Sequence, residues 1–170
     1  MRKRKPRRAR PLHAPFLIAR NQATALTAIE LASVMTPLHA AFDRLRRGRA
    51  SQDNWCLLAG CIAMAHNIER QGVVRGLSGH LAEADAALVA IEARASATGA
   101  WRAPVLYGHE IEAIDTFVDL HHFQLRQLSY GEFKRALKTT EGQARSRGME
   151  IVRLQGVTPS STTAERLFAS

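Results

Sequence analysis

The segment between Ser51 and Gly72 constrains the fold most, because its apolar residues occupy two sides of a helix. Ser51 is a favoured N-cap and Gly72 a favoured stop, so the segment is predicted to form one helix. One apolar stripe consists of Trp55, Leu58 and Ile62, and the other consists of Leu57, Cys61, Met64 and Ile68. A helix that is apolar on two sides has to be covered on both. We therefore expect this helix to be the central, most buried element.

Four other segments carry apolar residues at helical spacing and are separated by turn signals. They cover residues 25–47, 78–99, 109–128 and 129–148. The most regular is 109–128, in which the apolar positions step by three and four residues. The last begins with Ser129 followed by Glu132, a capping-box pair that marks the start of a helix. The pattern predicts one or more helices in each segment.

Pro37 interrupts the segment 25–47, and two interpretations follow from it. Thr36 is a favoured N-cap and proline a favoured first residue, so either two helices or one kinked helix is predicted. Two helices would form a partial helix-turn-helix over residues 27–47, with Thr27 as a cap. Threonine and proline stand where that motif normally has glycine at its turn. This departure favours one core helix with a basic C-terminal end.

Strand-like alternation is almost absent, which places the chain in the all-α class. Its 170 residues, 46% of them hydrophobic, suit one domain with a real core. We predict a compact bundle of about five helices over residues 21–148, with Trp101 folded back onto the core. A disordered basic arm (1–20) precedes the bundle. A weakly structured tail (149–170) follows it, with at most one short helix after Thr162.

The charge of the chain is concentrated at its N-terminus. The formal net charge is +9, from 24 Lys and Arg against 15 Asp and Glu, and residues 1–10 supply +7 of it. Residues 11–170 carry 17 basic and 15 acidic side chains and are nearly neutral. A block of like charge repels itself and stays extended, and Pro6, Pro11 and Pro15 discourage a helix. We therefore expect the arm to be disordered when it is free.

A flexible arm with seven cations gains affinity for a polyanion by releasing counterions, and it needs no fold to do so. The arm lacks the aromatic or leucine-rich amphipathic face that anchors a segment in lipid. The sequence therefore favours nucleic acid, bound without sequence specificity, over a membrane. A purely solubilising role is the alternative. The predicted phosphate contacts are Arg2, Lys3, Arg4, Lys5, Arg7, Arg8 and Arg10.

One face of segment 109–128 combines carboxylates with a histidine. It consists of Glu112, Asp115, Asp119 and His122, at spacings of three, four and three residues. Asp119 and His122 resemble half of a carboxylate di-metal site, but such a site needs a second E-x-x-H from a facing helix, and the sequence contains none. We interpret this face as a solvated polar surface, and we expect no metal and no cofactor.

His121 falls within the apolar stripe and is predicted to be buried, in the core or at a subunit contact. The sequence contains no nucleophile motif, P-loop or dinucleotide-binding glycine motif, so we expect no enzymatic activity. Cys56 and Cys61 lie on different sides of a helix, and neither CxxC nor CxxH occurs, so we expect reduced thiols in a cytoplasmic protein. The longest uncharged apolar stretch, residues 55–66, is too short to span a membrane.

Three stretches carry a resemblance to known proteins. They are MRKRK at the start, LHAAFDRLRRGRAS at 38–51 and DLHHFQLRQLSYGEFKRAL at 119–137. These stretches resemble small basic-headed proteins of uncharacterised function encoded by phages, prophages and plasmids of proteobacteria, over residues 1–145. The resemblance implies an accessory protein of a mobile element and brings no site with it. Two alternatives stay open: a structural protein that forms a helical homo-oligomer, and a transcriptional regulator that uses residues 27–47.

Overall fold

The computed structural model describes residue 19 and residues 21–146. Five helices are labelled in this part of the chain. They are α2 (Ala28–Arg46), α3 (Gln52–Gln71), α4 (Ser78–Ala95), α5 (Gly108–Gln127) and α6 (Tyr130–Ser146). Within the described residues, the only strand-like pairing is an isolated antiparallel bridge between Ala25 and Ser129. The prediction of an all-α bundle is confirmed.

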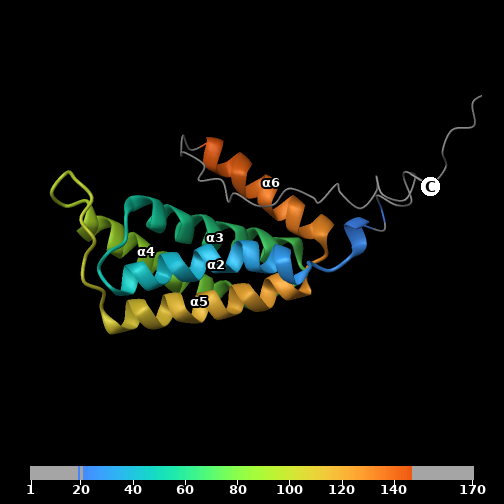
Figure 1. Ribbon diagram of the computed structural model, residues 1–170, viewed down its shortest axis with the longest axis horizontal. Coiled ribbons are helices and arrows are strands. Elements are labelled where there is room, and N and C mark those ends of the chain that lie inside the picture. Colours follow the sequence, from blue (N-terminus) through green and yellow to red (C-terminus); the bar gives the residue numbers. More distant parts are fainter. Residues whose placement is uncertain (1–18, 20, 147–170) are drawn as a thin grey trace, which may run out of the picture.

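Helices α2 to α5 alternate in direction along the bundle, and α6 lies across its outside (Figure 1). Contacts join α3 to each of the other four helices, while α2 and α4 both also contact α5. The principal partner of α6 is α3. The predicted central position of the helix that is apolar on two sides is therefore confirmed, since both of its stripes are covered.

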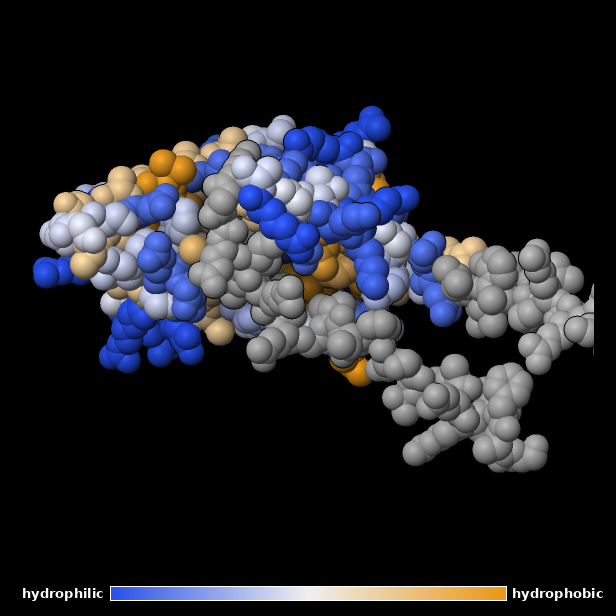
Figure 2. Space-filling view, turned by 90° about the horizontal axis from the view of Figure 1, so that it is seen from above, coloured by the Kyte–Doolittle hydropathy of each residue, from blue (hydrophilic) through white to orange (hydrophobic). Residues whose placement is uncertain are grey.

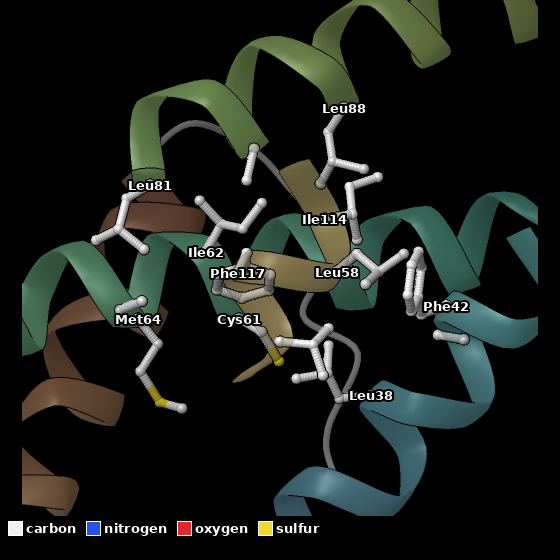
Figure 3. Packing of buried hydrophobic residues seen from close by; sticks show 14 of the residues in the cluster. Leu38, Phe42, Leu58, Cys61, Ile62, Met64, Leu81, Leu88, Ile114 and Phe117 are labelled. Carbon is white, nitrogen blue, oxygen red and sulfur yellow. The ribbon is translucent and has the colours of Figure 1, made fainter. Parts of the chain in front are cut away.

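Every helix contributes apolar side chains to one core (Figure 3). Leu38 from α2, Leu58 from α3 and Ile114 from α5 are fully buried there. Phe117 of α5 and Phe133 of α6 are the largest of the fully buried side chains. Burial of one such side chain is worth roughly 1.5–3 kcal/mol, so the shared core is the main source of stability.

The segment 25–47 forms one helix, not two. Thr27 caps α2 in a capping box with Glu30, and the helix continues through Pro37 to Arg46. Val34 and Leu38, on either side of the proline, are both completely buried in the same core. This shared burial explains why the helix does not break. The two-helix interpretation of residues 27–47 is therefore wrong.

The start of α4 is capped from outside the helix. Its N-cap residue, Leu77, makes no side-chain cap. Instead, Oε1 of Glu69 in α3 accepts hydrogen bonds from the backbone N–H groups of Gly76, Leu77 and Ser78 at 3.0, 2.9 and 3.0 Å. One carboxylate thereby pairs N–H groups that a helix start otherwise leaves unsatisfied.

The α4 helix ends at Ala95, four residues before the predicted stop at Gly99. The Ala95 carbonyl accepts a hydrogen bond from the Arg102 N–H at 2.9 Å, and Gly99 has a φ of +79° in the intervening turn. This turn brings Trp101 back to the bundle. Its indole nitrogen donates to the Ala50 carbonyl at 2.8 Å, so the predicted return of Trp101 to the core is confirmed.

Candidate nucleic-acid interface

The seven predicted phosphate contacts, Arg2 to Arg10, lie outside the described residues, as do the tail 149–170 and its expected short helix. The structure describes the start of the bundle, residues 21–25, to which the arm is joined. Residues 21–146 carry 13 basic and 13 acidic side chains and are formally neutral. A cationic surface on this body therefore has to arise from the uneven distribution of its charges.

The chain enters the fold beside the start of α6 (Figure 1). The Tyr130 N–H donates to the Thr24 carbonyl at 2.8 Å, and Ala25 forms its bridge with Ser129. A Cβ atom on Gly131 would lie only 3.0 Å from the backbone oxygen of Gln22. The absence of a side chain on Gly131 is thus what permits this close approach.

The first turn of α6 is fixed by the predicted capping box. The Glu132 carboxylate accepts from the backbone N–H of Ser129 at 2.8 Å and from its hydroxyl at 2.7 Å. The Ser129 hydroxyl oxygen in turn accepts from the Glu132 N–H at 3.3 Å. The hydrogen bonds that the Glu132 carboxylate accepts lower its pKa because they favour its ionised form, and the bond from the Ser129 backbone N–H has the largest effect.

A row of cations occupies the solvent face of α6. Lys134, Arg135 and Lys138 are exposed and fall within about 100° of the helix circumference. Lys134 and Lys138 are one turn apart, which separates them by about 6 Å along the axis. The capping residue Glu132 lies outside this arc, about 60° from Arg135, and the Arg135 charge also helps to lower the pKa of its carboxyl. We call Lys134, Arg135 and Lys138 the α6 basic face.

The α6 basic face is not neutralised by ion pairs. Among the described residues, none of its three members forms a salt bridge, whereas Arg145 further along the helix pairs with Glu141 at 3.4 Å. The Lys134 ammonium lies 5.0 Å from the ring centre of Tyr130. Figure 2 looks onto the side where α6 lies and shows hydrophilic residues over much of it. Within the described part of the chain, the side chains of the α6 basic face are therefore exposed and form no salt bridge.

A groove of about 680 Å³ runs between the entering chain and α6. Two amide side chains, an aromatic ring, a glycine and the α6 basic face line it. The lining residues are Asn21, Gln22, Tyr130, Gly131, Lys134, Arg135 and Lys138. The groove therefore combines hydrogen-bonding, aromatic and cationic groups at the place where the basic arm joins the bundle.

A second basic cluster lies at the C-terminal end of α2, at the opposite end of the bundle (Figure 1). It consists of Arg44, Arg46, Arg47 and Arg49. Arg47 pairs with Asp43 at 3.1 Å, and Arg46 lies 5.7 Å from the ring centre of Phe42. Cations at this end also complement the helix dipole. Their distance from the arm makes this cluster a natural control for the α6 basic face.

The polar face of α5 is solvated, as predicted. Glu112, Asp115, Asp119 and His122 are all exposed. In residues 19 and 21–146, no group of three or more His, Cys, Asp or Glu side chains is arranged to hold a metal ion. Across the same residues, no helix has both the length and the hydropathy that a membrane crossing requires.

His121 is completely buried, as its position in the apolar stripe predicts. Its Nδ1 lies 3.3 Å from Oε1 of Gln124, whose Nε2 donates to the Ala65 carbonyl at 3.2 Å. The Phe117 ring stacks on the imidazole at 5.5 Å between centres. Burial lowers the pKa of His121 to about 4, and this outweighs the opposing effect of Gln124. The ring is therefore neutral and part of the core.

Comparison of the chain with models of protein families, with curated proteins and with solved structures gives no match. The sequence prediction named the arm but missed the α6 basic face, although the spacing of Lys134, Arg135 and Lys138 was visible within the stretch EFKRALK. Only the fold places this face beside the point at which the arm is attached.

Proposed function

We propose that the protein associates with nucleic acid without sequence specificity, through two sets of cations. These are the arm residues Arg2 to Arg10 and the α6 basic face. The resemblance to phage and plasmid proteins supports a role as an accessory protein of a mobile element. No catalytic step is part of this proposal.

The observation that carries the proposal is that the arm joins the bundle beside cations that form no salt bridge with any described residue. The chain that continues into the arm contacts α6 through Gln22 and Thr24. Asn21 lies eleven residues after Arg10, a stretch that spans at most about 40 Å when fully extended. A polyanion held by the arm therefore remains within reach of Lys134 and Lys138. A solubilising arm does not require such a neighbour.

The salt dependence of binding measures how many phosphates the protein contacts. Seven arm cations and three α6 cations predict a slope of log K against log salt of about −9 on duplex DNA. Deletion of residues 2–10 should leave a slope of about −3. If only the arm contacts phosphates, the slope for the intact chain should be about −6, and binding should not be measurable after the deletion.

Binding to a duplex of random sequence, measured by fluorescence anisotropy at several salt concentrations, tests the proposal. Affinity should fall by orders of magnitude on deletion of residues 2–10, and it should vary little among unrelated sequences. Undiminished binding after the deletion would contradict the proposal. If the intact protein binds no nucleic acid and sediments as an oligomer, the structural homo-oligomer is the better description.

A further inference from the structure

We infer that the groove between the entering chain and α6 holds one nucleotide of a single strand, so the preferred partner is single-stranded nucleic acid. This inference rests on the proposed function and names its ligand class. Non-specific binding of phosphates does not use the amides of Asn21 and Gln22 or the ring of Tyr130, which line the groove. A bound nucleotide would give these three side chains a role.

The size and construction of the groove suit a nucleotide. Its volume of about 680 Å³ falls within the range of about 300–1,000 Å³ that is usual for small-molecule sites. One wall is the first turns of α6, and the other is a short helical turn at residues 21–23. The close approach of Gly131 to Gln22 and the hydrogen bond from Tyr130 to Thr24 hold these walls together. The groove is thus built into the fold.

The polar groups of the groove match the two chemical parts of a nucleotide. Asn21 and Gln22 each offer a donor and an acceptor, which is what the edge of a base requires. Lys134, Arg135 and Lys138 supply positive charge along the rim for the flanking phosphates. Amides and cations on opposite walls would therefore place the base against residues 21–22 and the backbone along α6.

The aromatic ring of Tyr130 strengthens the case for a base. Sites for single strands combine a cationic groove with an aromatic ring, since every base has a face that can stack. The Tyr130 hydroxyl is buried and has no hydrogen-bond partner among the described residues. The Lys134 ammonium lies 5.0 Å from the centre of this ring, so a base that stacks on Tyr130 shares the ring with a cation that can contact its phosphate.

A nucleic-acid duplex cannot place a base in this groove unless one of its base pairs opens. Its bases are paired and stacked inside, so extrusion of one costs a few kcal/mol. A duplex would therefore contact the α6 basic face through phosphates only and leave Asn21 and Gln22 unoccupied. A single strand gains both sets of contacts, and stacking alone adds roughly 1–3 kcal/mol per base. The groove thus predicts a preference for single strands of roughly tenfold or more.

The test compares an oligothymidine of about 12 nucleotides, a length within the usual site size, with a duplex of equal length. Both are titrated by fluorescence anisotropy against the full chain, the groove variant Asn21→Ala/Gln22→Ala and the control Gln52→Ala. All three amide side chains are exposed, and neither variant changes the charge that holds phosphates in both ligands. The full chain and the control should prefer the single strand by roughly tenfold, and the groove variant should lose most of that preference.

A second measurement locates the bound strand without any mutation. Ultraviolet cross-linking of the intact protein to the oligothymidine, followed by mass spectrometry, should give an adduct on the peptide that contains Tyr130. Equal affinity for both nucleic acids, or a groove variant that behaves like its control, would overturn the inference and leave the proposed function standing. If neither nucleic acid binds the full chain, the proposed function fails as well.

Discussion

The carboxylate of Glu69, in the last turn of α3, accepts a hydrogen bond from the backbone N–H of Ser78, the first residue of α4. Two further N–H groups, of Gly76 and Leu77, bond to the same oxygen. The connection between two core helices is therefore held by one side chain.

Glu69→Ala should lower the free energy of unfolding by about 1–3 kcal/mol, since three backbone N–H groups lose their shared acceptor. Urea unfolding followed by circular dichroism measures this loss. Glu112→Ala removes an exposed carboxylate from α5 and should change stability by less than about 0.5 kcal/mol. Equal effects of the two substitutions would show that the cap contributes nothing.

The stability of the protein should fall on acidification because His121 is buried and neutral. Its pKa is about 4 in the folded state against 6.5 for the ordinary group. Between these values the unfolded chain binds a proton that the folded chain does not, so stability is retained above pH 6.5 and lost as pH falls toward 4. The loss attributable to this ring is roughly 3 kcal/mol. Urea unfolding at a series of pH values measures the curve.

His121→Leu should flatten this acid limb, although at neutral pH it leaves the Gln124 Oε1 atom without its donor. We expect that loss to cost about 1–3 kcal/mol. The double variant His121→Leu/Gln124→Leu removes both partners and should recover part of the loss. If the double variant is less stable than the sum of the single substitutions predicts, the polar pair has a larger role than packing.

Gly131→Ala should destabilise the attachment of the arm. The added Cβ would lie 3.0 Å from the Gln22 backbone oxygen, so the entering chain has to move. We expect a loss of about 1 kcal/mol in thermal unfolding and faster hydrogen exchange at the Tyr130 amide. Gly142→Ala, in open space on the same helix, should instead stabilise the protein by about 0.5–1 kcal/mol. If both substitutions change stability equally, the close approach of Gly131 to Gln22 does not restrict the side chain at position 131.

Cys61 should be inert toward thiol reagents in the native protein. It is almost fully buried, and burial raises the pKa of its thiol to about 12, so the reactive thiolate is scarce. Labelling with a maleimide followed by peptide mass spectrometry should find Cys61 modified only when urea unfolds the chain. Rapid modification under native conditions would indicate that the core opens at α3.

The sequence predicts the helices well because each buries one continuous stripe. The positions Leu81, Leu88 and Ile91 of α4, for instance, follow from spacing alone and are all buried. Features that depend on contacts between distant segments did not follow from spacing. Phe117 and Gln124 lie off the predicted stripe of α5, yet both are completely buried because α3 also packs against that helix. The predicted stripe consists of Ile111, Ile114, Val118, His121, Leu125 and Leu128.

In the candidate site, too, the local features could be predicted from the sequence and the contact between distant segments could not. The charge of the arm can be counted in the sequence, and the row from Lys134 to Lys138 follows from helical geometry. The groove requires residues 21–22 to lie against Gly131, more than one hundred residues later. Nothing in the local pattern around either segment indicates that contact.

The position of α6 on the outside of the bundle has a consequence for the order in which the protein opens. Helices α2 to α5 cover one another, but α6 relies chiefly on α3. A helix with one main partner is among the first to detach in a partial opening, and such openings need far less free energy than complete unfolding. The cations on α6 therefore lie on the helix with the fewest helix partners, so an anion that binds both α6 and the entering chain would help to hold that helix on the bundle.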